Sequence, residues 1–219
     1  MIPFLERIMS TERKTLGSIA VAVSTIFLGC SDDSYPVERC EQGQGIVFQD
    51  SDAPIIGHAS APIEVVLFGD LKCPYTKKTA VALDGLVDEL TDNGDGEKVK
   101  ILFHHFPRAD NIEAQNAALA LAAAQRQGNH VFWLLFWQLV VAPDLSYEQV
   151  QKYAEVIVPD FDRFQIDLSS QETEQIIDRD VALASKLGFT SIPGVVICGV
   201  IVENNTDKVI ENIEYLVNK

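Results

Sequence analysis

The sequence contains no Cys-x-x-Cys pair, although it has four cysteines: Cys30, Cys40, Cys73 and Cys198. It also lacks the paired Cys/His spacing that is typical of a zinc site. Its histidines offer no other ligand set, because His104 and His105 are adjacent on an expected strand and point to opposite faces of it. We therefore expect neither a bound metal nor a cofactor.

Positive charge is scarce, since 17 Lys and Arg stand against 32 Asp and Glu and give a formal net charge of −15. Such an acidic surface repels phosphate backbones and anionic lipid headgroups, which disfavours nucleic-acid binding. We interpret the excess of acidic residues as a feature that keeps the protein soluble. A long apolar run is also missing, because the uncharged stretch 15–29 is shorter than the roughly 20 residues that span a membrane. With 219 residues, 47% of them hydrophobic, the chain can still bury the core of one domain.

The first 29 residues have the layout of a secretory signal peptide. Arg13 and Lys14 precede the uncharged stretch 15–29. The stretch ends Phe-Leu-Gly before Cys30 and resembles a bacterial lipobox, although Phe27 stands where Leu is usual. This resemblance implies that Cys30 carries a lipid at the periplasmic face of a bacterial membrane and has no redox role, with residues 30–53 as a tether. Plain cleavage nearby and an uncleaved anchor are the alternatives.

Export would place the chain in an oxidising compartment, where disulfides persist. Cys40 and Cys198 then become possible disulfide partners, because Cys30 would be modified. The sequence alone does not establish that pairing.

The folded part is expected to begin at residue 54, with a turn over residues 57–62. The run 62–70, PIEVVLFGD, is short and rich in β-branched residues, which predicts a buried strand. Cys73 follows, and Pro74 suits the first turn of a helix that continues over residues 75–91. A second strand is expected over residues 98–106, so the order strand, helix, strand predicts a parallel βαβ unit.

Residues 110–188 are expected to be helical throughout, and capping-box patterns at Ser146 and Ser169 predict two of the helix starts. The chain is expected to end with a hairpin of two short strands around Gly199. A final amphipathic helix over residues 207–217 follows the hairpin.

Three segments resemble the DsbA-like branch of the thioredoxin superfamily, whose members exchange thiols and disulfides. The segments are VVLFGDLKCPY (65–75), FHHFP (103–107) with the alanine-rich stretch after it, and LGFTSIPGVVI (187–197). The resemblance covers about residues 55–219 and implies an α/β thioredoxin fold with an inserted all-helical subdomain, about residues 108–185. It also implies that Pro193 is cis and lies beside Cys73, so that an extended substrate pairs with Ile192.

The chain departs from this family at the reactive centre, because Thr76 stands where a second cysteine is usual. Cys73 at a helix N-terminus is still expected to favour its nucleophilic thiolate form, and the Thr76 hydroxyl is expected to donate a hydrogen bond to the sulfur. A lone thiol attacks a disulfide but cannot release itself, so an external thiol must complete the reaction. The expected partners are exported proteins with cysteines or disulfides, or small-thiol adducts.

Several side chains near Cys73 have two interpretations. Asp70 is either an acid that assists proton transfer or, the preferred reading, a carboxylate that caps backbone N–H groups. Pro74 and Tyr75 are assigned to substrate contact, with simple packing as the equal alternative for Tyr75. The aromatic residues Trp133, Phe136 and Trp137 either line a peptide groove or, as their helical spacing favours, belong to the core.

The leading hypothesis is thus a lipid-anchored enzyme of thiol–disulfide exchange with the single thiol Cys73. The runner-up is a redox-inactive thioredoxin-fold module that binds peptides or proteins near Pro193. A third hypothesis is structural, with Cys73 in a permanent disulfide with Cys40 or Cys198.

Overall fold

The structure is a computed structural model that describes residues 52–219. The predicted signal peptide, Cys30, Cys40 and the tether up to residue 51 lie outside the described residues. Ala53, which was expected to belong to the tether, is instead buried against the sheet.

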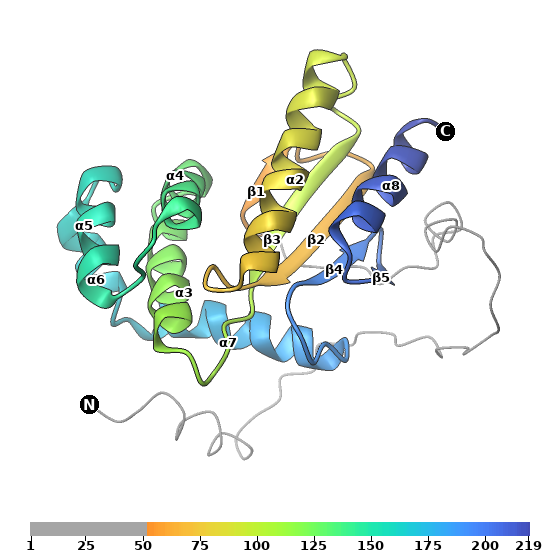
Figure 1. The fold of residues 1–219 in the computed structure, drawn as a ribbon. Helices are drawn as coiled ribbons and strands as arrows, with labels where there is room; N and C mark the ends of the chain where they lie inside the picture. Colours follow the sequence, from red (N-terminus) through yellow and green to blue (C-terminus); the bar gives the residue numbers. More distant parts are fainter. Residues whose placement is uncertain (1–51) are drawn as a thin grey trace. The chain divides into compact units, whose positions relative to one another are not determined.

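Five strands form one sheet in the order β1-β3-β2-β4-β5 (Figure 1). The strands are β1 (Ile55–Gly57), β2 (Ile63–Gly69), β3 (Val99–His105), β4 (Gly194–Ile197) and β5 (Val200–Val202). The central pair, β2 and β3, is parallel, and the other neighbouring pairs are antiparallel. β2 is buried on both faces, as its continuous apolar run predicts. The predicted βαβ unit and the C-terminal hairpin are both confirmed.

Seven helices are present in residues 52–219, and they cover both faces of the sheet. The helices are α2 (Pro74–Asp92), α3 (Ile112–Gln125), α4 (Asn129–Val141), α5 (Tyr147–Ile157), α6 (Phe161–Asp167), α7 (Gln171–Lys186) and α8 (Thr206–Val217). Leu83 of α2, Val209 of α8 and Phe132 of α4 share the larger core with one face of β2. Ala184 of α7 packs against the other face. The fold is therefore the predicted α/β thioredoxin fold, with five helices between β3 and β4.

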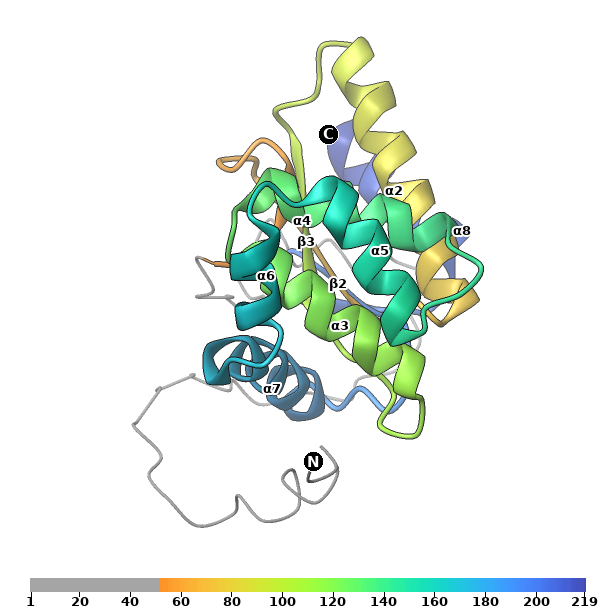
Figure 2. The ribbon, with the colours of Figure 1, turned by 90° about the vertical axis from the view of Figure 1, so that its left-hand side faces the viewer.

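Helices α3 to α6 form a group beside the sheet, and Figure 2 faces this group. The segment from 110 to 188 is helical as predicted, but it is broken by short connections rather than continuous. The cap at Ser146 is wrong in detail, because its side chain makes no cap hydrogen bond, and its N–H instead donates to Asp144. The other predicted cap, Ser169, is one residue too early, because the N-cap is Ser170, whose side chain accepts the Thr173 N–H.

The edge strand β1 was not predicted, because residue 57 was expected to open a turn. Its backbone is held by side chains from α4: the Asn129 amide bonds both the N–H and the carbonyl of Ile55, and the Trp133 indole donates to the same carbonyl. The Asn129 amide thus makes the two hydrogen bonds that the backbone of a neighbouring strand would make. Such partners, more than 70 residues away in sequence, leave no local pattern.

A buried His–Asp contact attaches α7 to the end of β3. His104 and Asp180 are both buried, and their Nδ1 and Oδ1 atoms are 2.9 Å apart. The other Asp180 oxygen accepts the backbone N–H of His105 at 2.8 Å. As predicted, the two histidine rings lie on opposite faces of β3: His104 stacks on Phe68, and His105 contacts Phe132 edge-on.

In the part of the chain that the structure describes, no helix combines the length and apolarity needed to cross a membrane.

Replacing Asp180 by Ala should lower the free energy of unfolding by about 2–4 kcal/mol. The change removes the carboxylate that contacts the buried His104 ring and accepts the His105 backbone N–H. Gln175→Ala, an exposed change on the same helix, should cost less than about 0.5 kcal/mol. Urea unfolding of both variants measures the difference. Equal, small effects would show that this contact does not anchor α7.

The His105 ring should make the protein less stable in acid. Burial lowers the pKa of His105 from 6.5 to about 4, against the opposing charge of Asp180. Between these values the unfolded chain binds a proton that the folded chain does not, so the free energy of unfolding falls as the pH drops from 6.5 to 4, by up to about 3 kcal/mol. Well above pH 6.5 the ring is neutral in both states and contributes no pH dependence.

Urea unfolding at several pH values tests this effect in the His105→Phe variant, which keeps an aromatic ring but has no titrating group. Its stability should depend less on pH than that of the wild type over this window. The exposed change His130→Gln should keep the wild-type slope. An unchanged slope in His105→Phe would contradict the assignment.

Candidate active site at Cys73

The buried carboxylate of Asp70 organises the loop that leads into α2. One of its oxygens accepts the backbone N–H groups of Lys72 and Cys73, both at 2.8 Å. The other oxygen accepts the backbone N–H of Arg108, at 3.2 Å, from the loop after β3. Asp70 is 3% exposed, so these bonds replace water for a buried carboxylate. This arrangement is that of the preferred interpretation, in which Asp70 caps backbone N–H groups.

Cys73 is the N-cap residue of α2, and Pro74 occupies the first helical position. Proline fits there because the first N–H groups of a helix lack intrahelical partners in any case. The thiol is partly exposed and is not part of a disulfide. The neighbouring Tyr75 is 68% exposed, which does not fit simple packing.

The loop before β4 brings a distant segment to the thiol. The Ile192–Pro193 peptide bond is cis, and the Cys73 Sγ atom lies 3.9 Å from the Ile192 carbonyl oxygen. Gly194 lets the loop pack closely, because a Cβ there would meet the Phe189 ring at 2.8 Å. The structure therefore places Cys73, Ile192 and Pro193 together, as expected.

Thr76 differs from its expected role. Its side chain is fully buried, and among the described residues its hydroxyl oxygen has no hydrogen-bond partner. The expected hydrogen bond from Thr76 to the Cys73 sulfur is therefore not made. Thr76 instead packs on Gly69, where a Cβ would lie 2.4 Å from the Thr76 methyl group. The position lies inside the molecule, next to the strand that carries the site.

Cys198 lies at the other end of the sheet from Cys73. Its backbone N–H donates to Glu64 at the start of β2, whereas Cys73 follows the end of that strand. Both thiols are free in the structure. A disulfide needs Cα atoms within about 7 Å of each other, so the hypothesised pairing of Cys73 with Cys198 is wrong. Pairing of either residue with Cys40 involves a position outside the described residues.

Charged side chains of both signs lie around the thiol. Lys72 forms an ion pair with Glu113 at the start of α3. The Lys77 ammonium group donates to the carbonyl of Leu139 at the end of α4, and desolvation, together with the charge of Lys72, lowers its pKa. Arg108 forms two hydrogen bonds to Asp110, at 3.1 and 2.8 Å.

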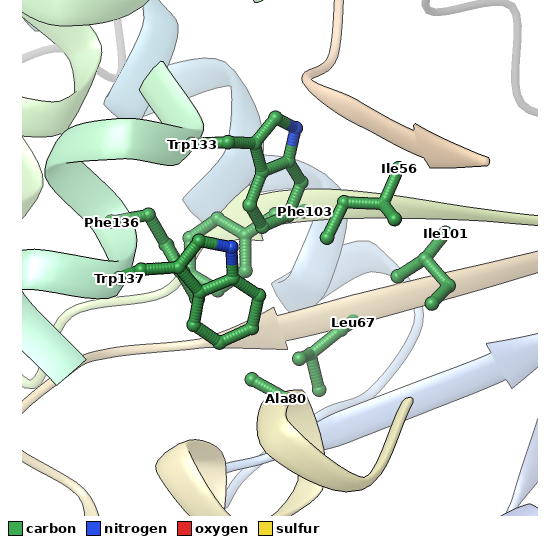
Figure 3. A pocket seen from close by; sticks show the side chains of 8 residues that line it. All are labelled: Ile56, Leu67, Ala80, Ile101, Phe103, Trp133, Phe136 and Trp137. Carbon is green, nitrogen blue, oxygen red and sulfur yellow. The ribbon is translucent and has the colours of Figure 1, made fainter. Parts of the chain in front are cut away.

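The three aromatic residues that were weighed as a peptide groove belong mainly to the core. Phe136 is fully buried and Trp133 nearly so, while Trp137 is partly buried. Together with Leu67 and Ile101 they line a small apolar pocket over the sheet, which Figure 3 shows. The core interpretation is thus confirmed for Trp133 and Phe136.

Sequence reasoning missed Arg108 and His105 as neighbours of the site. Arg108 carried no signal, since only the bond of its N–H to Asp70 places it beside α2. His105 lines a small pocket with Gly69 and Asp70, and its Nε2 atom has no partner among the described residues. No group of three or more possible metal ligands occurs within residues 52–219.

Comparisons with known proteins agree with this geometry. Residues 49–214 match the thioredoxin family. A curated relative in Bacillus cereus, named probable disulfide bond formation protein D, is 26% identical over 87% of this chain and 90% of its own length.

Two similar crystal structures cover the described fold. A thioredoxin-like oxidoreductase from Silicibacter pomeroyi has a TM-score of 0.66 at 24% identity, over 78% of this chain and 95% of that one. Oxidised BdbD from Bacillus subtilis has a TM-score of 0.65 at 21% identity, over 77% and 94%. The family match, which spans more than half of the sequence, shows that the chain belongs to the thioredoxin family, and the two structures share its fold.

Proposed function

We propose that the chain is a thiol–disulfide oxidoreductase that acts on exported proteins or small-thiol adducts through the single thiol of Cys73. The observation that carries this proposal is the position of that thiol: partly exposed, at the N-cap of α2, and facing the carbonyl of Ile192. The relative named for disulfide bond formation supports the same chemistry.

The reaction begins when the Cys73 thiolate attacks one sulfur of a substrate disulfide. A new S–S bond forms to Cys73, the substrate bond breaks, and the departing sulfur takes the electron pair and then a proton. The N–H groups in the first turn of α2 lack intrahelical partners and carry partial positive charge, next to the sulfur that is negatively charged in this step. Pro74 removes one of these donors, which leaves those of Tyr75 and Thr76.

An external thiol completes the cycle, because Thr76 supplies no second sulfur. Its thiolate attacks the mixed disulfide, forms a disulfide with the substrate sulfur, and releases the Cys73 thiolate. Asp70 holds Cys73 in place throughout by accepting its backbone N–H. We assign Asp70 this positioning role rather than proton transfer, since both of its oxygens already accept N–H groups.

Substrate contact is assigned to the residues on both sides of the thiol. Tyr75 and Pro74 are exposed on the α2 side. On the other side, an extended substrate segment would pair with the backbone of Ile192, beside Pro193. These groups recognise backbone and apolar surface rather than one particular side chain.

The cellular setting follows from the same proposal. The signal-like stretch and the lipobox-like ending before Cys30 support export and a lipid anchor on the periplasmic side of a bacterial membrane. An anchored domain would meet exported proteins with cysteines or disulfides, and a reduced thiol in that compartment would act as the resolving partner. Cys198, whose thiol has no disulfide partner among the described residues, is assigned as the disulfide partner of Cys40 in this proposal.

Mixing the full chain with an excess of a disulfide-containing peptide should yield one peptide adduct on Cys73 that persists until a small thiol such as glutathione is added. Peptide mapping by mass spectrometry distinguishes this adduct from adducts on the other cysteines. Cys73→Ser should abolish it. A Cys73 that stays unmodified would contradict the exchange function and favour the redox-inactive binding module, which would still bind the peptide.

Replacing Thr76 by Cys should shorten the life of this adduct, because the new thiol would attack the mixed disulfide within the same molecule. Intramolecular attack should release the peptide on the order of 100-fold faster than spontaneous release in the wild type. Time-resolved quenching with acid and mass spectrometry measures the rate.

Thr76→Ser is the matched control, since it keeps a hydroxyl and should leave the adduct persistent. Equal lifetimes in Thr76→Cys and Thr76→Ser would show that position 76 cannot reach the sulfur. The single-thiol cycle would then not be explained by the loss of a resolving cysteine at this position.

A further inference from the structure

We propose that polypeptide substrates of Cys73 dock an apolar side chain, followed along the chain by a basic one, on the surface between α2 and α4. This inference rests on the proposed function and deepens it, because it selects polypeptide segments over small-thiol adducts as the substrate class. We call this region the α2–α4 surface. It is formed by Val81 of α2 and by Leu134, Trp137 and Val141 of α4.

One stripe of α2 leads from the thiol to this surface. Its members are spaced by four, three and four residues, which is the spacing of one helix face: Cys73, Lys77, Ala80 and Asp84. Two of them show that the stripe faces α4. The Lys77 ammonium group donates to the Leu139 carbonyl of α4, and Ala80 lines the small apolar pocket together with side chains of α4.

The facing stripe of α4 is apolar. Leu134, Trp137 and Val141 are spaced by three and four residues, and Trp137 lines the pocket with Ala80 of α2. Figure 3 shows the Trp137 ring extending from α4 toward Ala80. The pocket beneath the ring is too small for a further side chain, so an incoming apolar group would lie on Trp137 and not under it.

Apolar side chains on both helices are exposed at this surface. Val81 is 54% exposed on α2, whereas Leu134 is 45% and Val141 74% exposed on α4. Trp137 between them is only partly buried. Exposed apolar side chains that occur singly need no explanation, but a cluster beside a reactive group is typical of a binding surface.

The charges on the α2 side favour a basic partner. Neither Asp84 nor Asp88 forms an ion pair with another described residue, and α4 contains no Lys, Arg, Asp or Glu. Burial raises the pKa of Asp84, and the charge of Asp88, one turn further along, adds to this effect. Like charges four residues apart also destabilise a helix. A basic side chain of a substrate would compensate both carboxylates.

Helix geometry fixes the spacing that a substrate needs. With a rise of about 1.5 Å per residue, Ala80 lies about 10 Å and Asp84 about 16 Å beyond Cys73 along α2. An extended polypeptide advances about 3.3 Å per residue. The apolar side chain therefore belongs about three residues from the substrate cysteine, and the basic one about five residues from it. A small thiol such as glutathione carries neither group.

The test uses the full chain and synthetic hexapeptides with blocked ends, each supplied as its symmetrical disulfide. The reference peptide has a cysteine at one end, a lysine at the other, a phenylalanine three residues from the cysteine, and glycine elsewhere. It is made in both chain directions. Matched peptides carry serine in place of phenylalanine, or glutamate in place of lysine. Acid quenching and peptide mass spectrometry give the rate of mixed-disulfide formation at Cys73.

In one chain direction, the change of phenylalanine to serine should slow the reaction about fivefold or more, because it removes apolar contact area. The change of lysine to glutamate should slow it about threefold or more, because an attraction becomes a repulsion. Val141→Ser should remove most of the preference for phenylalanine, and Asp84→Asn should weaken the preference for lysine.

Val156→Ser on α5 and Glu172→Gln on α7 are the matched controls, since they alter an exposed apolar and an exposed acidic residue outside this surface. Both should keep the two preferences. Equal rates for all peptides, or preferences that survive in Val141→Ser and Asp84→Asn, would overturn the inference and leave the proposed function intact.

Sedimentation of the full chain adds a second outcome. A dimer that Val141→Ser dissociates would show that a second copy of the chain covers the α2–α4 surface, and would overturn the inference as well. A Cys73 that reacts with none of the peptides would instead overturn the proposed function.

Discussion

The structure of the site depends on one buried carboxylate. Asp70 accepts three backbone N–H groups, two from the turn before α2 and one from the loop after β3. A buried carboxylate is costly unless its oxygens are satisfied, so the two loops are constrained to the positions that satisfy it. This constraint holds Cys73 at the N-cap of α2 and brings Arg108 to its side.

Helix α7 of the insertion supports the same site from the face of the sheet that lies opposite α2. Asp180 of α7 contacts both His104 and His105 at the end of β3. Phe68 of β2 stacks on His104 and contacts Phe189, so the chain after α7 is packed on the end of β2. The loop that follows then reaches Cys73. Five helices thus separate β3 from β4 in sequence without separating the two halves of the site in space.

The sequence predicts the elements whose signals are local. The apolar run of β2, the proline after Cys73 and the alanine-rich start of the insertion each indicate their structure within a few residues. The missed features all depend on tertiary contacts. Asn129 bonds the backbone of Ile55 in β1, Thr76 packs on Gly69, and the Asp70 carboxylate accepts the backbone N–H of Arg108. Side-chain contacts across the fold, unlike helix caps and β-branched runs, leave no periodic pattern in one sequence.

The most direct test of the single-thiol account is a competition between the two thiols that the structure describes as free. The full chain is mixed with oxidised glutathione at neutral pH, and the rates at which Cys73 and Cys198 form mixed disulfides are measured by mass spectrometry. The account predicts that Cys73 reacts at least on the order of tenfold faster, because its sulfur is partly exposed at a helix N-terminus. Equal rates, or a faster reaction at Cys198, would contradict it.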